Sequence, residues 1–313
     1  MRQQRPFRFG VAAEGAPSRE QWVDKARKVE DLGYATFLVA DHFVNEFPPI
    51  TALLSAADAT NKLRVGSFVF DNDFRHPALL AKEAATMDLL SGGRLEFGIG
   101  AGWHRPEYEQ VGLPFEAAGV RISRLQEAIQ IIKRFFTDES VTFSGNYYKI
   151  NDLKCFPKPV QRPHPPFFIG GGGKRLLSLA AREADIVGVH LKVNADGTVD
   201  ASEHTEAALA QKVEWVRQAA GERFDALELN LLVSLVAVTE DRRQTAEHYI
   251  HEWELENATP ERLLQNPYLL IGSVEQISED IQMKRERFGI SYFVVFDEHM
   301  EAFAPVVARL AGR

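Results

Sequence analysis

The chain has 313 residues, of which 45% are hydrophobic and 26% charged, a composition that predicts a globular protein and excludes collagenous, low-complexity and largely disordered chains. Its 44 Asp and Glu residues outnumber its 36 Lys and Arg residues, which gives a formal net charge of −8. Because such a protein has no overall positive field, we expect neither nucleic acid nor a membrane surface as a partner.

The single cysteine, Cys155, cannot form an internal disulfide, as is usual in a reducing compartment. The N-terminal residues lack the apolar region of a signal peptide. The longest apolar run, residues 231–238, is too short to span a bilayer. Together these features predict a soluble, cytoplasmic protein.

Eight short apolar runs rich in β-forming residues recur along the chain, and each is followed by a helix-compatible segment. They cover residues 7–12, 35–40, 64–70, 94–99, 166–169, 185–189, 228–238 and 290–296. Strands that alternate with helices in this way are parallel and covered by helices, so the candidates are a doubly wound sheet and a closed (β/α)8 barrel. Eight units favour the α/β class TIM barrel, and we expect residues 1–313 to form a single domain of this kind.

Two helices of this pattern have recognisable ends, with the spacing of a capping box at the start and a glycine after the last turn. These residues are Ser18, Gln21 and Gly33 near the N-terminus and Ser273, Gln276 and Gly289 near the C-terminus. Residues 138–165 and 253–270 break the alternation with Pro-rich or Gly-Asn turns. We interpret both stretches as loop insertions over the C-terminal mouth of the barrel.

The carboxyl ends of barrel strands carry the active site, so we rank polar residues by that position. Four glycines, Gly170 to Gly173, follow the fifth run and precede a helix, which suits either a phosphate cradle or a tight turn chosen for backbone geometry. Gly98, Gly100 and Gly102 leave one face of the fourth strand bare, either for a flat ligand or for close packing.

Asp41 and His42 follow the second strand, where an imidazole can donate or accept a proton near neutral pH or can serve a structural role. Barrel hydrolases assemble metal ligands at the same mouth. The first strand ends in GVAAEG with no His-x-His pair, and the other histidines are scattered. We therefore expect no metal site.

Several segments read together resemble the luciferase-like monooxygenase superfamily, and more narrowly its branch of deazaflavin (coenzyme F420)-dependent oxidoreductases. The resemblance extends from Phe7 to about Phe296 and depends on the combination of SGGR, G-x-G-x-G and the later glycine run. The segments are LVADHF, HPALLAKEAATMDLLSGGRLEFGIGAGW, GVRISRLQEAIQIIK, PKPVQRPHPPFFIGGGG and AAREADIVG.

The resemblance implies a (β/α)8 barrel with coenzyme F420, or alternatively FMN, lying in the mouth. It places Asp41 and His42 beside the ring and a cis peptide bond between Phe68 and Val69 behind it. It implies that the cofactor contacts come from Asp41, Phe68, Val69, Phe70, Asp71, Gly102, Trp103, Gly170, Gly171, Gly172 and Gly173. Asp71 departs from the family pattern, since a carboxylate would repel a phosphate of the cofactor tail.

Two further departures concern the reaction. The sugar-phosphate dehydrogenases of this branch have a catalytic glutamate where this chain has Trp103, and a tryptophan where it has Glu46. We therefore do not expect glucose 6-phosphate oxidation. The resemblance favours a reductase that transfers hydride to an activated C=C or C=N bond of a small-molecule or peptide-derived substrate, with His42 and then Glu46 as the candidate catalytic acids. The alternative is an FMN-dependent monooxygenase, and a homodimer is common among such relatives.

Overall fold

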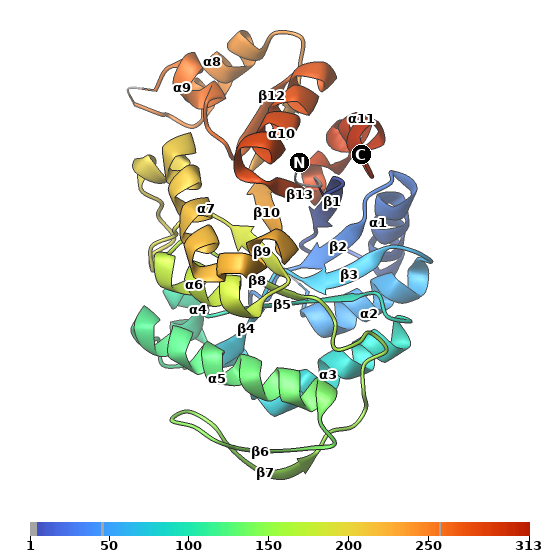
Figure 1. Cartoon of the computed structure of the whole chain (residues 1–313). Coiled ribbons are helices and arrows are strands. Elements are labelled where there is room, and N and C mark those ends of the chain that lie inside the picture. Colours follow the sequence, from blue (N-terminus) through green and yellow to red (C-terminus); the bar gives the residue numbers. More distant parts are fainter. Residues whose placement is uncertain (1–4, 45–46, 257) are drawn as a thin grey trace.

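The computed structural model describes residues 5–44, 47–256 and 258–313, and it confirms the (β/α)8 barrel. All neighbouring barrel strands are parallel, and the pairing of the third strand with the fourth closes the ring. Figure 1 shows the helices arranged around this central sheet. The strands are β1 (Arg8–Ala12), β2 (Thr36–Val39), β3 (Arg64–Ser67) with its continuation β4 (Phe70–Asp71), β5 (Leu95–Gly100), β8 (Phe167–Gly171), β9 (Ile186–Val189), β10 (Glu228–Val233) and β13 (Ile290–Phe296).

The helices around the barrel begin and end close to the predicted signals. Ser18 accepts a hydrogen bond from the backbone of Gln21, and Ser273 and Gln276 form a reciprocal capping box. Gly289 ends its helix with a φ of 77°, a conformation that favours glycine. The helices are α1 (Arg19–Asp31), α2 (Pro49–Ala59), α3 (Pro77–Leu90), α4 (Arg105–Gln110), α5 (Ala118–Thr137), α6 (Lys174–Glu183), α7 (Glu206–Ala220), α10 (Val274–Phe288) and α11 (Met300–Leu310).

The core lies between the strands and these helices. On α5 the apolar face is fully buried, with Leu125, Ile129, Ile132 and Phe136 all inaccessible to solvent. Burial of one such side chain contributes about 1.5–3 kcal/mol, so the amphipathic pattern is enough to fix which face of the helix meets the sheet. Among the described residues, no helix is both long enough and apolar enough to cross a membrane.

The predicted insertion at residues 138–165 is a β-hairpin rather than an open loop. Its strands, β6 (Ser140–Ser144) and β7 (Lys149–Lys154), pair antiparallel. The Glu127 carboxylate on α5 accepts backbone hydrogen bonds from residues 146–148 and so ties the hairpin turn to that helix. Figure 1 shows the hairpin on the outer side of α5.

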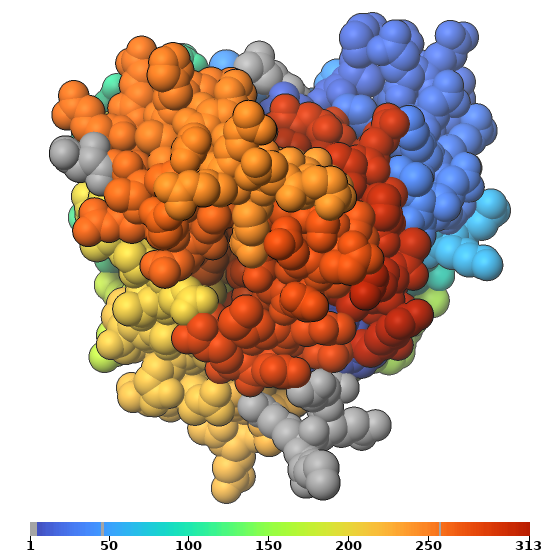
Figure 2. Space-filling view, turned by 90° about the horizontal axis from the view of Figure 1, so that it is seen from above, coloured from blue at the N-terminus to red at the C-terminus, as the bar shows by residue number. Residues whose placement is uncertain are grey.

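The prediction of one strand over residues 228–238 is wrong, because the chain leaves the barrel at Ser234. Residues beyond it form β11 (Leu235–Val238), which pairs with β12 (Leu269–Gly272) in a separate sheet. The intervening chain holds α8 (Arg242–Glu252) and α9 (Pro260–Leu264), so residues 253–270 are also more ordered than a loop. In Figure 2 this orange segment packs against the red α10 and α11 region.

Two buried carboxylates and two part-buried arginines form a network at the amino-terminal end of the barrel. The Arg8 guanidinium donates to Glu96 at 2.6 Å and to Glu228 at 2.8 Å, and Arg64 donates to Glu96 at 2.8 Å. Arg8 also lies 4.3 Å from the ring centroid of Tyr292. Burial alone would raise the pKa of Glu96, but Arg8 and Arg64 hold that pKa below its usual value. Glu96 therefore joins β1, β3 and β5, and Glu228 adds β10 through Arg8.

We predict that Glu96→Gln lowers the free energy of unfolding by about 3 kcal/mol at pH 7, because it leaves two arginines without their buried partner. Since the pKa of Glu96 is lowered in the folded protein, the stabilisation is present above the unfolded pKa of 4.5 and is lost as the pH falls through the folded value. Urea denaturation at several pH values measures the difference. The exposed pair Arg243–Glu247 provides the control, and Glu247→Gln should change stability by less than about 0.5 kcal/mol.

Candidate functional site

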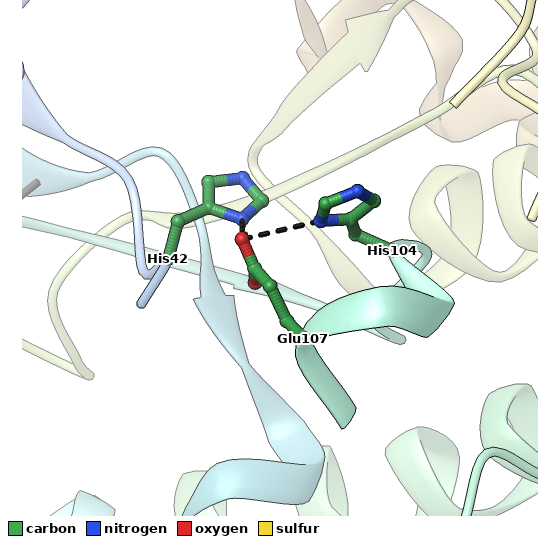
Figure 3. A group of neighbouring side chains, drawn as sticks. All are labelled: His42, His104 and Glu107. Atoms are coloured by element: carbon green, nitrogen blue, oxygen red, sulfur yellow. Dashed lines mark hydrogen bonds and ion pairs between the residues drawn. The ribbon is translucent and has the colours of Figure 1, made fainter. Parts of the chain in front are cut away.

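The mouth of the barrel brings together a histidine from the end of β2 and a carboxylate from α4. His42 Nδ1 lies 2.9 Å from each carboxylate oxygen of Glu107, and His104 Nδ1 lies 3.2 Å from Glu107 Oε1. The Glu107 side chain is 3% exposed, whereas both histidines are 26% exposed. Figure 3 shows the two imidazoles pointing their Nδ1 atoms at the same carboxylate.

This contact defines what His42 can do chemically. A carboxylate accepts hydrogen bonds, so Glu107 holds a proton on Nδ1 of His42 and leaves Nε2 to exchange protons. In Figure 3 the second nitrogen of the His42 ring points away from Glu107. The arrangement suits a proton donor or acceptor whose ring is held in one tautomer.

Asp41, predicted to lie beside a cofactor ring, holds neighbouring backbone and side chains in place. Its carboxylate forms an ion pair with Arg75, whose Nη2 lies 3.0 Å from Oδ1, and it accepts the backbone N–H of Asp71 at 3.0 Å. Both oxygens are therefore engaged by the protein. Asp41 fixes the start of the segment that carries Asp71.

Asp71 is buried under the mouth and is bound by α4. The Tyr108 hydroxyl donates to its carboxyl at 2.8 Å, and the backbone N–H of Asp73 donates at 2.9 Å. Burial raises the pKa of Asp71 to about 7, although these two hydrogen bonds oppose the increase. Its carboxyl is thus held within the protein, and a proton on it would remove the charge that was expected to repel a phosphate.

The bare face of β5 is explained by close packing. A Cβ on Gly98 would lie 3.0 Å from the Val69 side chain and closer still to the Ser67 carbonyl, and a Cβ on Gly100 would lie 2.7 Å from Val69. The predicted cis peptide bond between Phe68 and Val69 is present in this adjoining segment. The glycines therefore make room for the β3–β4 connection, and Gly102, with a φ of 69°, makes room for Tyr108.

Close packing explains three of the four glycines in the second run. A Cβ on Gly170 would meet His190 at 2.9 Å, on Gly171 it would meet Leu176 at 2.6 Å, and on Gly172 it would overlap the backbone of residues 191–192. Gly173 differs, because a Cβ there meets no atom within 4 Å. It is the N-cap of α6 and supplies no side-chain hydrogen bond, so the first-turn N–H groups remain available to an anion.

The aromatic residues predicted around the ring differ in exposure. Phe70 is fully buried and packs 5.7 Å from Phe97, so its side chain offers no surface to a ligand. Trp103 is 39% exposed, and its ring lies 5.7 Å from His42. A cavity of about 500 Å³ opens beside it, lined also by Arg105, Phe115 and Asn194. Glu46, the second predicted catalytic residue, lies outside the described residues.

His190 at the end of β9 is a further polar group of the mouth. Its ring lies 5.6 Å from Phe68 and 6.4 Å from Phe168, and its buried Nδ1 has no hydrogen-bond partner within the described chain. Burial, with a contribution from Lys212, lowers its pKa to about 4. The ring is therefore neutral at pH 7 and offers an unused nitrogen.

The sequence analysis missed Glu107 because this residue lies within α4, beyond the strand end, and it did not select His104, the N-cap of the same helix, as a site residue. The signal that could have found them is their i, i+3 spacing, which puts both side chains on one face of a short helix. Trp103 stands where related dehydrogenases have a glutamate, but α4 supplies another carboxylate, Glu107, which contacts His42 directly.

A (β/α)8 barrel with a polar cluster at the carboxyl ends of its strands is the arrangement of an enzyme. Residues 5–306 match the model of the luciferase-like monooxygenase family, and the chain belongs to that family. This supports an oxidoreductase, as the resemblance in the sequence implied.

Two kinds of relative match the chain. It is 34% identical over 187 residues to an FMNH2-dependent dimethylsulfone monooxygenase of Pseudomonas putida, covering 56% of this chain and 51% of that protein. It is 33% identical over 171 residues to an F420-dependent glucose-6-phosphate dehydrogenase of Amycolatopsis mediterranei, covering 52% and 51%. The chain thus spans about half the length of these curated relatives.

The fold is also that of a solved relative. The structure of the coenzyme F420-dependent tetrahydromethanopterin reductase from Methanopyrus kandleri superimposes with a TM-score of 0.76 and 17% sequence identity, covering 97% of this chain and 99% of that one. At this identity the comparison establishes the fold alone.

We predict that Asp71 makes the protein less stable as the pH rises. Since the folded pKa is about 7 and the model value is 3.8, the favourable contribution of the protonated carboxyl is present below about pH 4 and is lost as the pH rises through 7. Asp71→Asn, which keeps the shape, should therefore gain stability relative to the wild type between pH 4 and pH 8. Urea denaturation at these pH values measures the free energy of unfolding of both proteins. A difference between them that does not change with pH would contradict the prediction.

Proposed function

We propose that this protein is an F420-dependent oxidoreductase, and specifically a reductase that transfers hydride to an activated C=C or C=N bond of a small-molecule or peptide-derived substrate. The observation that carries the proposal is the His42–Glu107 contact, which places a histidine of fixed tautomer at the barrel mouth. Hydride transfer to such a bond must be completed by a proton, and this pair is suited to supply it. The similarity to F420-dependent relatives supports the choice of cofactor.

The residues of the mouth fit a phosphate-bearing tricyclic cofactor. The first turn of α6, which follows the N-cap Gly173 and has no side-chain cap, would bind its phosphate. The exposed ring of Trp103 and the part-buried ring of Phe68 would contact its apolar surface, and Nδ1 of His190 would find a hydrogen-bond partner. When bound, the deazaflavin supplies the hydride.

The protein's own part of the reaction is to position the substrate and move one proton. The cavity beside Trp103 would accept the substrate, and its mixed lining of rings and polar groups is typical of small-molecule sites. His42 holds the proton on Nε2 and releases it to the carbon or nitrogen that becomes nucleophilic. The Nδ1 proton stays on the hydrogen bond to Glu107, so the ring returns to the neutral form in its original orientation.

An FMN-dependent monooxygenase is the second candidate, favoured by the 34% identity to the Pseudomonas putida enzyme. In that reaction His42 would bind or orient the reduced flavin and the oxygenated substrate. The two candidates share the same phosphate cradle and the same His42. They therefore differ in which cofactor the apoprotein retains.

We predict that the apoprotein binds coenzyme F420 more tightly than FMN, by at least about tenfold, as measured by absorbance after equilibrium dialysis. Gly173→Asp tests the cradle, because an aspartate at an N-cap favours the helix while its carboxylate occupies the place of the phosphate. This variant should keep its melting temperature and lose about tenfold in cofactor affinity. Preferential retention of FMN would instead establish the second candidate.

We predict that His42→Gln lowers kcat by about 10²–10⁴-fold with a smaller change in cofactor affinity, because glutamine keeps a hydrogen-bonding group but cannot transfer a proton. Glu107→Gln should lower kcat less, because the amide oxygen of glutamine still accepts the Nδ1–H of His42 and keeps the ring in the same tautomer. A normal turnover of His42→Gln with an enone or imine acceptor would exclude His42 as the donor.

A further inference from the structure

The cluster of His42, His104 and Glu107 has a composition that the proposed reaction does not require. A proton donor needs one histidine and one carboxylate, but here a second imidazole points the same nitrogen at the same oxygen. The ligand-type atoms of the three side chains all lie within 4.8 Å of one another. Figure 3 shows that they converge from the end of β2 and from the start of α4.

Two of the separations lie close to those of a metal site. Tetrahedral zinc has bonds of about 2.0–2.1 Å to His nitrogen and carboxylate oxygen, which puts adjacent ligand atoms about 3.3 Å apart. The Nδ1 atoms of His42 and His104 lie 2.9 Å and 3.2 Å from Glu107 Oε1. Only a small outward movement of the two rings is therefore needed to admit an ion.

We propose that His42, His104 and Glu107 form a binding site for a divalent transition metal ion. The preferred ion is Zn²⁺, which has no redox chemistry. Two neutral imidazoles and one carboxylate suit this class of ion, because Mg²⁺ and Ca²⁺ prefer oxygen ligands. Glu107 supplies a buried negative charge, and the side chains of both histidines are 26% exposed, so an ion can enter from the mouth. Three protein ligands leave a coordination position for water.

Metal binding would change which nitrogen of the His42 ring carries the proton. The ion takes the Nδ1 lone pair, so the proton moves to Nε2 and the ring can no longer cycle between its neutral and charged forms. The occupied site therefore cannot deliver protons from His42. Zn²⁺ should act as a reversible inhibitor, a consequence that rests on the proposed function, whereas binding itself does not.

Binding is tested on the apoprotein, in the absence of any other cofactor. Co²⁺ is titrated while tryptophan fluorescence is recorded, because the Trp103 ring lies 4.8 Å from His104 and 5.7 Å from His42 and should be quenched by a bound Co²⁺ ion. Calorimetry with Zn²⁺ gives the stoichiometry and Kd. We expect one ion per chain at micromolar concentrations, displacement of Co²⁺ by Zn²⁺, and loss of the quenching in Trp103→Phe.

The ligands are tested by substitution. Loss of second-sphere partners already weakens metal binding about 10–100-fold, so loss of a ligand in His104→Ala should raise the Kd for Zn²⁺ at least about 100-fold. Glu107→Gln should do the same if it folds. His248→Ala is the matched control, since His248 forms an exposed pair with Glu252 at 3.3 Å far along the chain. Equal affinity of His104→Ala and wild type, or no binding at millimolar Zn²⁺, would overturn the site.

Turnover of the holoenzyme separates this proposal from the proposed function. Zn²⁺ should inhibit the wild type at the Kd found by calorimetry, and His104→Ala should resist that inhibition by the same factor as its loss of affinity. Binding without inhibition would leave the metal site standing and would remove His42 from proton transfer. Absence of binding together with a large loss of turnover in His42→Gln would reject the metal site and retain the proposed function.

Discussion

Closure of the parallel sheet by the β3–β5 pairing is the constraint on which the mouth depends. It brings the carboxyl ends of β2, β5 and β9 to one rim, although His42, His104 and His190 are far apart in the sequence. At the opposite end, Glu96 joins Arg8 to Arg64 across the barrel and leaves no buried charge of this group unpaired. The ion pairs of Glu96, which link barrel strands, thus lie at the amino-terminal end, opposite the candidate site in the mouth.

The rim itself has two tiers with different tasks. The lower tier is structural: Asp41 binds Arg75 and the backbone at Asp71, and Tyr108 binds the Asp71 carboxyl. The upper tier, His42 over Glu107, retains an exposed face and an exchangeable proton. The residues of the lower tier form hydrogen bonds with one another. The fold therefore does not need the free nitrogen of His42 as a hydrogen-bonding group.

Much of this architecture could be predicted from the sequence, because hydrophobic runs and helix caps are local signals. The barrel, the capping box at Ser273 and Gln276 and, through family resemblance, the cis bond between Phe68 and Val69 are all present. The end of β10 at Val233 could not be predicted, since apolar residues resume directly after Ser234 and form β11 in a different sheet.

The site was predicted less completely, for a different physical reason. The position after a strand identified His42, but the partner of its Nδ1 depends on how α4 folds back over the mouth. Likewise the glycine pattern of β5 is the same whether it faces a ligand or a bulged neighbour, and only the tertiary contact with Val69 distinguishes the two. Roles of Phe68, Trp103 and Gly170 to Gly173 toward a cofactor stay predictions.

Helix α4 has only six residues, yet two consecutive side chains on it serve both tiers of the rim. Glu107 contacts His42, and Tyr108 contacts Asp71, whose pKa lies at about 7. Adjacent residues of one helical turn cannot shift independently, so any movement of α4 changes the surroundings of the Asp71 carboxyl and of the His42 ring together. Replacement of this short helix by that of a related barrel would consequently change the contacts of His42 and of Asp71 at the same time.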